Sequence, residues 1–156
     1  MPDTPPTFEQ RNLPLLLLQA RESVIAQFRP ILNANGITEQ QWRIVRVLTD
    51  LGPLEPRQIG ELCRISSPSL AGVLARMDAL GLVVRERLAS DQRRVMVSLT
   101  ERSRALAVAM APQIAATYAR ISQAVGTEFS DRFYAMLDEL IARLQPGDAS
   151  EPDYAG

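Results

Sequence analysis

Apolar residues recur every three or four positions along most of the chain, the spacing of an amphipathic helix. The first such stretch runs from about Leu13 to Asn33, and residues 33–36 (NANG) tolerate the left-handed backbone that ends a helix. Pro30 is expected to bend the last turn of this helix or to end it early. The predicted apolar face consists of Leu17, Ala20, Val24, Phe28 and Leu32.

Two shorter helices are predicted next. Thr38 and Gln41 form the capping box T-x-x-Q, which opens a helix that ends at Gly52 and Pro53. A further helix spans residues 56–63, and Leu54, between the two, is predicted to form a stub of strand that pairs with a later hairpin. The apolar positions are Trp42, Val45, Val47, Leu48 and Leu51 on the first of these helices and Ile59 and Leu62 on the second.

The stretch 66–100 predicts a helix followed by a β-hairpin. Ser66 and Ser67 are good N-cap residues for the helix. Residues 82–88 and 94–99 alternate between apolar and polar, and the charged turn between them completes a hairpin. The buried stripe of the helix consists of Leu70, Val73, Leu74, Met77 and Leu80, and Gly81 ends it.

The helical pattern returns after Thr100 and continues almost to the end of the chain. Pro112 is expected to kink the first of two helices, Gly126 separates them, and order is expected to end at Pro146. Their apolar faces are too long to be covered within a small domain, so a second copy of the chain is the expected partner. The faces consist of Leu106, Met110, Ile114, Tyr118, Ile121 and Val125, and of Phe129, Phe133, Met136, Leu137, Leu140, Ile141 and Leu144.

The predicted fold is mainly α with a small β-wing. Two short helices joined by a tight turn make a helix-turn-helix whose second helix enters the major groove, and the hairpin that follows is a wing. We expect residues 1–156 to form a single domain. Its expected parts are a flexible arm (1–10), dimerisation helices (11–36 and 101–145), a winged-helix DNA-binding lobe (37–100) and a disordered acidic tail (146–156).

The charge of the chain is concentrated in one region. The formal net charge is −1, and every basic residue is an arginine. Between residues 57 and 94, however, seven arginines stand against four acids, so any contact with nucleic acid is expected there. The arginines are residues 57, 64, 76, 85, 87, 93 and 94.

The composition argues against an enzyme. The chain has no histidine and a single cysteine, Cys63, and it lacks a glycine-rich phosphate loop and a nucleophile elbow. We therefore expect no metal and no other cofactor. Without an apolar run of membrane length or a cleavable leader, a cytoplasmic protein is expected. Beside Leu62 and Ile65, Cys63 is read as a small buried hydrophobe, with a redox-sensing thiol as the alternative.

The residues opposite the buried stripe suit a DNA groove. Ser67, Ser69 and Gly72 are short, and Arg76 is cationic. The hairpin tip carries two adjacent arginines next to an acid, an arrangement that recurs in contacts with the minor groove and with phosphate. A solvated charged turn, or a helical protein-interaction module without DNA binding, is the alternative. The tip residues are Asp91, Arg93 and Arg94.

This order of elements resembles the MarR family of winged-helix transcription regulators over about Leu13 to Leu144. The wing motif DQRRVMVSLTE (91–101) is similar to that family's wing signature. The first-helix RE and FRP elements and the motif TEQQWR (38–43) resemble, more narrowly, the branch that regulates homoprotocatechuate degradation operons.

The resemblance implies a homodimer that occupies a pseudo-palindromic operator and represses an aromatic-compound catabolic operon until a phenolic or aromatic carboxylate releases it. Activation instead of repression stays open. By the same resemblance, Arg93 matches the arginine that enters the minor groove, Asp91 matches the acid that orients it, and Arg94 is expected on a phosphate. The residues that fall on the recognition helix are Ser66, Ser67, Ser69, Leu70, Val73 and Arg76.

A ligand site for an aromatic acid needs a cation and an apolar slot. Arg21 and Phe28 lie about two turns apart on the first helix, and Trp42 and Arg46 lie at i and i+4 on the second. We hypothesise a pocket bounded by these four residues. In the alternative interpretation, Phe28 and Trp42 are core aromatics and the arginines form salt bridges of the dimer.

Overall fold

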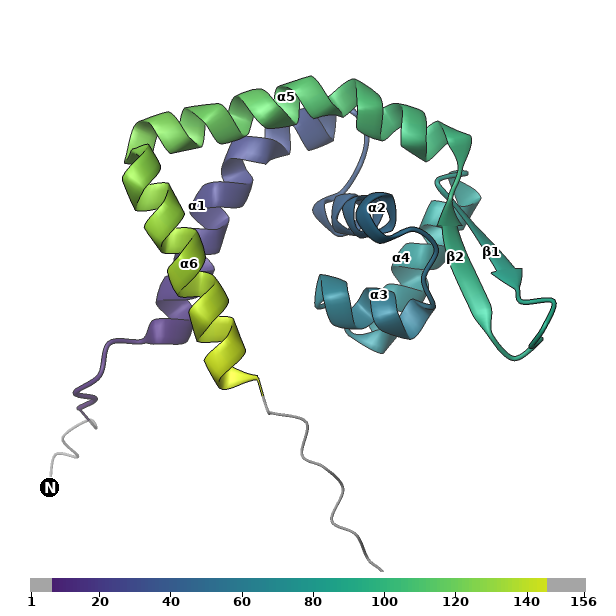
Figure 1. Cartoon of the computed structure of the whole chain (residues 1–156), viewed down its shortest axis with the longest axis horizontal. Coiled ribbons are helices and arrows are strands. Elements are labelled where there is room, and N and C mark those ends of the chain that lie inside the picture. The colour runs from purple at the N-terminus through teal and green to yellow at the C-terminus, as the bar shows by residue number, and fades with distance from the viewer. Residues whose placement is uncertain (1–6, 146–156) are drawn as a thin grey trace, which may run out of the picture. The chain divides into compact units, whose positions relative to one another are not determined.

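Residues 7–145 are described by a computed structural model, in which helices and one hairpin follow in the predicted order (Figure 1). The fold class, mainly α with a small β-wing, is confirmed. Residues 1–6 and the predicted acidic tail 146–156 lie outside the described residues. The elements are α1 Leu13–Ala34, α2 Glu39–Leu51, α3 Pro56–Cys63, α4 Ser67–Ala79, β1 Val83–Arg87, β2 Val95–Leu99, α5 Glu101–Val125 and α6 Thr127–Leu144.

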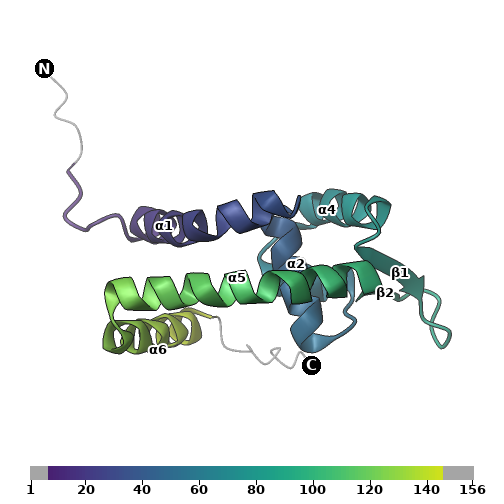
Figure 2. The ribbon, with the colours of Figure 1, turned by 90° about the horizontal axis from the view of Figure 1, so that it is seen from above.

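The chain forms two compact units, divided after Ala115. In the first unit, α2, α3 and α4 gather against the hairpin, which projects beyond the helices (Figures 1 and 2). The core of this unit is made of side chains with little or no exposure to solvent, drawn from every element between α1 and α5. They include Leu32, Ile44, Val45, Ile59, Met77, Val83, Val97 and Met110.

Helix α1 is buried only near its C-terminal end. Asn12 caps its start by accepting a hydrogen bond from the Leu15 backbone N–H at 3.1 Å. Phe28 and Leu32 are buried as predicted, whereas Leu17 and Val24 are exposed, so the N-terminal half of the predicted face has no cover within the described chain. Pro30 lies inside the helix, which continues to Ala34 and does not end early.

Helix α2 begins at the predicted capping box. Thr38 accepts a hydrogen bond from the Gln41 N–H at 3.2 Å, and the Gln41 side chain accepts one from the Thr38 N–H at 3.0 Å. The predicted apolar face is partly wrong, because Ile44 lies at the centre of the core and Leu51 is exposed. Val45 and Leu48 of the predicted face are buried, whereas Trp42 and Val47 are half-buried.

Helices α3 and α4 meet at a tight turn. Arg64, between them, has a left-handed backbone with φ of 52°, and the N–H groups of Arg64 and Ile65 both donate to the Gly60 carbonyl. Leu62 and Leu80 were predicted to be buried, but they are 52% and 44% exposed. Each lies at or next to the end of a helix, and Cys63 and Leu82 near them are buried.

The hairpin is anchored to the helical lobe by one additional residue. Strands β1 and β2 pair in antiparallel register from Val83 opposite Leu99 to Arg87 opposite Val95. Leu54 forms the predicted bridge with Val97 through two backbone hydrogen bonds of 3.1 and 2.8 Å. Because a two-stranded hairpin is marginally stable by itself, this third contact helps to hold the wing in place.

Helix α5 starts at a reciprocal cap and continues through Pro112. The Thr100 N–H donates to Ser103 Oγ at 3.0 Å, and the Ser103 N–H donates to Thr100 Oγ1 at 3.2 Å. In the part of α5 that belongs to the first unit, the side chains of Met110 and Ile114 are buried. No helix within residues 7–145 combines the length and apolar character needed to cross a membrane.

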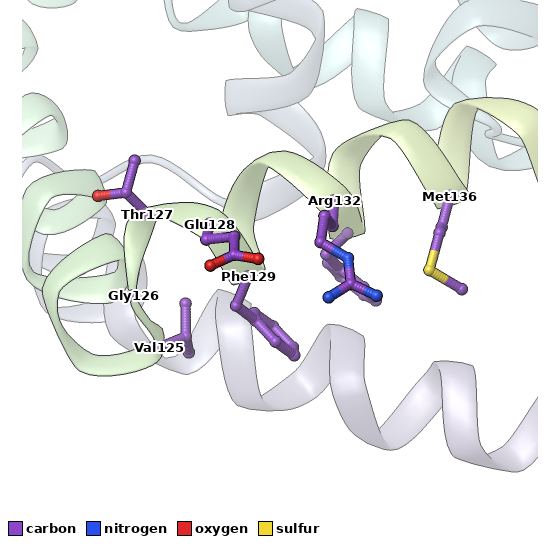
Figure 3. Close-up of a pocket in the computed structure, with 8 residues that line it drawn as sticks. Val125, Gly126, Thr127, Glu128, Phe129, Arg132 and Met136 are labelled. Carbon is purple, nitrogen blue, oxygen red and sulfur yellow. The ribbon is translucent and has the colours of Figure 1, made fainter.

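In the second unit, the apolar face of α6 is exposed. No residue of α6 is buried, although Phe129 and Phe133 stack with ring centroids 5.8 Å apart. A groove of about 550 Å³ opens at the start of α6, and Figure 3 shows Phe129, Arg132 and Met136 projecting to the same side of the helix. The apolar stripe predicted from the sequence is therefore present and uncovered.

Gly60 sets how closely α3 and α4 approach. A Cβ at this position would lie 3.1 Å from the Ile65 carbonyl oxygen and 3.3 Å from Leu70 Cδ2. We expect Gly60→Ala to lower the free energy of unfolding by about 1–3 kcal/mol, measured by urea denaturation.

Gly72 is the matched control, because it also lies inside a helix but a Cβ there would meet its nearest side-chain atom, on Arg76, at an ordinary 3.6 Å. Gly72→Ala should be neutral or stabilise the protein by about 0.5–1 kcal/mol. Equal effects of the two substitutions would contradict a tight contact at Gly60.

Candidate functional site

The exposed face of α4 is short and polar. Ser66, Ser67, Ser69 and Arg76 are exposed, and the Ser66 hydroxyl donates to that of Ser69 at 3.1 Å. Pro68 lies in the first turn, where a missing backbone donor leaves no helical bond unmade. The helix therefore begins with a row of small hydroxyl-bearing side chains that a groove can approach closely.

Leu70 and Val73, which the family resemblance places on the recognition helix, belong to the buried stripe that the helical spacing predicted and not to the face open to DNA. They are only 4% and 2% exposed and pack into the core. Their side chains face away from any groove that α4 enters, so we correct their role to anchoring the helix.

Hydrogen bonds within the wing tip shape it as a turn. The Asp91 carboxylate accepts a hydrogen bond from the Arg93 backbone N–H at 3.0 Å, and the Asp91 carbonyl accepts one from the Arg94 N–H at 3.1 Å. Arg87 Nη1 donates to the Gln92 carbonyl at 2.6 Å. Asp91 thus orients the tip backbone, and the Arg93 side chain projects from a braced turn.

Arg94 points to the base of the wing. Its Nε donates to the carboxylate of Glu55, the N-cap residue of α3, and this hydrogen bond raises the pKa of the Arg94 guanidinium. The pair joins residues 39 positions apart in the sequence. Arg94 therefore ties the wing to the helix-turn-helix, and its guanidinium is already engaged.

The seven arginines of this region fall into two groups. Arg57 pairs with Glu61, and Arg85 donates to Asp78 Oδ2 through Nε and Nη2 at 3.1 and 2.9 Å. Arg87 and Arg94 are engaged as described above. The other three arginines make no ion pair with any residue in the range 7–145. They are Arg64 in the turn, Arg76 on α4 and Arg93 at the wing tip.

Arg64 was not singled out by the sequence pattern. The signal that identifies it is its place two residues before Ser66, in the turn of the helix-turn-helix. A hollow of about 670 Å³ between α3, α4 and the hairpin is lined by Ser66, Ser67 and Arg85, among others. The helix-turn-helix and wing thus present a concave surface, and the two arginines that line it, Arg57 and Arg85, are both paired with acids.

The residues of the hypothesised effector pocket are engaged within the chain. Arg21 pairs with Glu39 and, at 3.4 Å, with Glu22, whereas Arg46 lies 3.8 Å from Asp50. Phe28 is buried and Trp42 is half-buried. Phe28 is thus a core aromatic, as the alternative interpretation had it, but the arginines find acidic partners in their own chain.

Two residues beside this group were missed by the sequence analysis. Glu39 Oε1 binds Arg21 and also lies 3.5 Å from Arg43 Nε. Arg43 Nη1 in turn donates to the backbone carbonyl of Cys63 at 2.5 Å. The i, i+4 spacing of Glu39 and Arg43 is visible in the sequence, but their links to α1 and α3 are not.

Cys63 is a poor candidate for a reactive thiol. It is 3% exposed, and burial raises the pKa of its thiol, an effect that the nearby Arg43 charge only partly opposes. A raised pKa leaves less thiolate at neutral pH, and the thiolate is the reactive form.

We therefore expect alkylation of Cys63 by iodoacetamide at about pH 8 to be at least about 100-fold slower in the native protein than in urea. In the native protein the reagent reaches the thiol only when the surrounding structure unfolds locally. Mass spectrometry of quenched samples measures both rates. Similar native and unfolded rates would contradict the inert-thiol interpretation and favour a redox role.

The chain is similar to proteins of one family. Residues 35–94 match the MarR family. The chain is 40% identical over 128 residues to the HTH-type transcriptional regulator FarR of Neisseria gonorrhoeae, an overlap that covers 82% of this chain and 85% of FarR. It is 37% identical over 145 residues to the homoprotocatechuate degradative operon repressor of Escherichia coli, covering 93% and 96% of the two chains.

The crystal structure of NadR in complex with 4-hydroxyphenylacetate matches the fold with a TM-score of 0.75 and 37% sequence identity. The match covers 88% of this chain and 97% of NadR. The resemblance inferred from the sequence, including the narrower branch, is confirmed by these relatives.

Proposed function

Because the chain belongs to the MarR family of transcriptional regulators, we propose that it is a dimeric, sequence-specific DNA-binding repressor of an aromatic-compound catabolic operon. Its relatives are transcriptional regulators and not enzymes. The observation that carries the proposal is the set of unpaired arginines on the turn, α4 and wing tip of a winged helix-turn-helix. The proposed site of action is the cytoplasm, where the DNA of a bacterial cell lies.

In the proposed complex, α4 enters the major groove with Ser66, Ser67, Ser69 and Arg76 toward the DNA. These short side chains let the helix backbone approach the base edges, while hydroxyl and guanidinium groups bond to bases and phosphates. Arg93 enters the minor groove, held at the braced tip by Asp91.

The proposed dimer covers the apolar surface that one chain leaves open. The face of α6 and the leucines near the start of α1 are exposed, and a second copy supplies a matching surface through two-fold symmetry. The residues 11–36 and 101–145 act as dimerisation helices in this proposal. A two-fold dimer places two α4 helices on successive major grooves of a palindromic operator, about 34 Å apart.

The proposed effector is a phenolic or aromatic carboxylate. This class is supported by two relatives, one named for a homoprotocatechuate operon and one solved with 4-hydroxyphenylacetate. In this chain, Arg21 and Arg46 supply cations for the carboxylate, and the half-buried Trp42 supplies a ring face. The buried ring of Phe28 forms the floor of the proposed effector pocket.

Binding of the effector releases the operator by a population shift. Occupancy favours a spacing of the two α4 helices that no longer fits successive grooves. A redox mechanism at Cys63 is less well supported, because that thiol is buried and its pKa is raised.

Salt dependence tests the DNA-binding proposal. Affinity for the selected operator should fall by about a thousandfold between 50 and 200 mM salt, as expected for a dimer that neutralises several phosphates. Arg93→Gln should weaken binding and lower the magnitude of the log–log slope by about two per dimer. Fluorescence anisotropy on DNA enriched by selection from random sequence gives both quantities.

The matched variant is Arg94→Gln at the neighbouring position. Because Arg94 is engaged by Glu55, its loss should leave the salt slope near the wild-type value even if affinity falls. Absence of any salt dependence in the wild type would refute DNA binding, and a reduced slope in Arg94→Gln alone would exchange the proposed roles of the two arginines.

Effector binding is tested with Arg21→Ala. Loss of one charge-assisted hydrogen bond should raise the concentration of 4-hydroxyphenylacetate needed for operator release by about 10- to 100-fold. Arg29→Ala, on the same helix and paired with Glu22, is the control and should respond as the wild type does. An undiminished response in Arg21→Ala would remove this residue from the effector site.

A further inference from the structure

One carboxylate stands between two guanidinium groups from different parts of the first unit. Glu39 lies in the first turn of α2, and its Oε1 atom binds Arg21 of α1 and faces Nε of Arg43, four residues later on α2. The side chains of Glu39 and Arg43 are 27% and 32% exposed, so the cluster is only partly screened by water.

Arg43 extends this cluster to the helix-turn-helix. Its Nη1 donates at 2.5 Å to the carbonyl of Cys63, which is the last residue of α3. The carbonyls at the end of a helix have no partner within the helix, and a guanidinium there also interacts favourably with the helix dipole. The next residue is the left-handed Arg64, and Ser66 is the N-cap residue of α4. Arg43 therefore bonds the turn that fixes where α4 begins.

The cluster has one hydrogen bond fewer than it can make. Arg43 Nε is buried and donates no hydrogen bond to any described residue, although Glu39 Oε1 is 3.5 Å away. Unsatisfied buried donors are rare because leaving one unpaired is costly. Arg21 holds Glu39 Oε1 at a position 3.5 Å from Arg43 Nε, which is longer than a good hydrogen bond, so bonding to Arg43 Nε requires the carboxylate to move away from Arg21.

We propose that Glu39 and Arg43 are positioning residues that connect the guanidinium of Arg21 to the turn between α3 and α4. When Arg21 is taken by another carboxylate, Glu39 is released to accept a hydrogen bond from Arg43 Nε. The Arg43 guanidinium then rotates, and its bond to the Cys63 carbonyl changes with it. The identification of this other carboxylate as the effector rests on the proposed function.

The connection is measured first in the full-length protein without DNA or effector. Arg21→Gln frees Glu39, as an effector would, and should change the amide exchange rates of Arg64 and Ile65 by at least about threefold. Both amides donate to the Gly60 carbonyl in the affected turn. In the Glu39→Gln background, the same Arg21→Gln substitution should have no effect on them, because the shared carboxylate is gone.

Glu22→Gln is the matched control. Glu22 also pairs with Arg21, at 3.4 Å, but its other partner is Arg29 and not Arg43. This variant should leave the Arg64 and Ile65 exchange rates at the wild-type values. The connection is overturned if Arg21→Gln leaves the turn unchanged, if its effect persists without the Glu39 charge, or if Glu22→Gln reproduces it.

The effector step is measured separately by operator release with 4-hydroxyphenylacetate. Glu39→Gln should keep operator affinity within about threefold of the wild type but reduce the effector-induced change in that affinity by about tenfold. A full response in Glu39→Gln would overturn the effector step. If the wild type binds DNA but no aromatic carboxylate releases it, the proposed effector fails, while the exchange rates still decide the connection.

Discussion

The close approach of α3 and α4 at Gly60 is the constraint on which the DNA-binding lobe depends. The Gly60 carbonyl accepts hydrogen bonds from two consecutive backbone N–H groups, those of Arg64 and Ile65. This pair of hydrogen bonds turns the chain within three residues. The turn also forces Arg64 into the left-handed region, a conformation that costs a residue with a Cβ about 1–2 kcal/mol. Burial of Ile59 and Leu70 on either side offsets that cost.

The positions of the acids decide which cations remain available. Arginines near an acid in space are neutralised by it, and Asp78, Glu55 and Glu61 each engage one. Arg64, Arg76 and Arg93 lie on separate elements and have no such neighbour among residues 7–145. A chain with a net charge of −1 can therefore present a localised cationic surface.

Local signals predicted the parts of the fold that depend on neighbouring residues. The capping box at Thr38, the hairpin and the Leu54 bridge all follow from short motifs and alternation. Burial at helix ends was predicted less well, because helical spacing stops applying where the helix ends: Leu62 and Leu80 are exposed, whereas Cys63 and Leu82 near them are buried. The links of Arg94 to Glu55 and of Arg43 to Cys63 join distant residues, and no spacing rule reveals such pairs.

The Leu54 bridge makes the wing a lever with a defined pivot. Val97, opposite Leu54, lies four residues from Arg93, which is in the turn before β2, so the two residues are at most about 13 Å apart. A rotation of about 10° at the bridge therefore moves the Arg93 side chain by about 2 Å, close to the length of a hydrogen bond. Leu54 and Glu55, at the start of α3, both hold the wing, so small rearrangements there are geometrically amplified at the tip while the two strands stay paired.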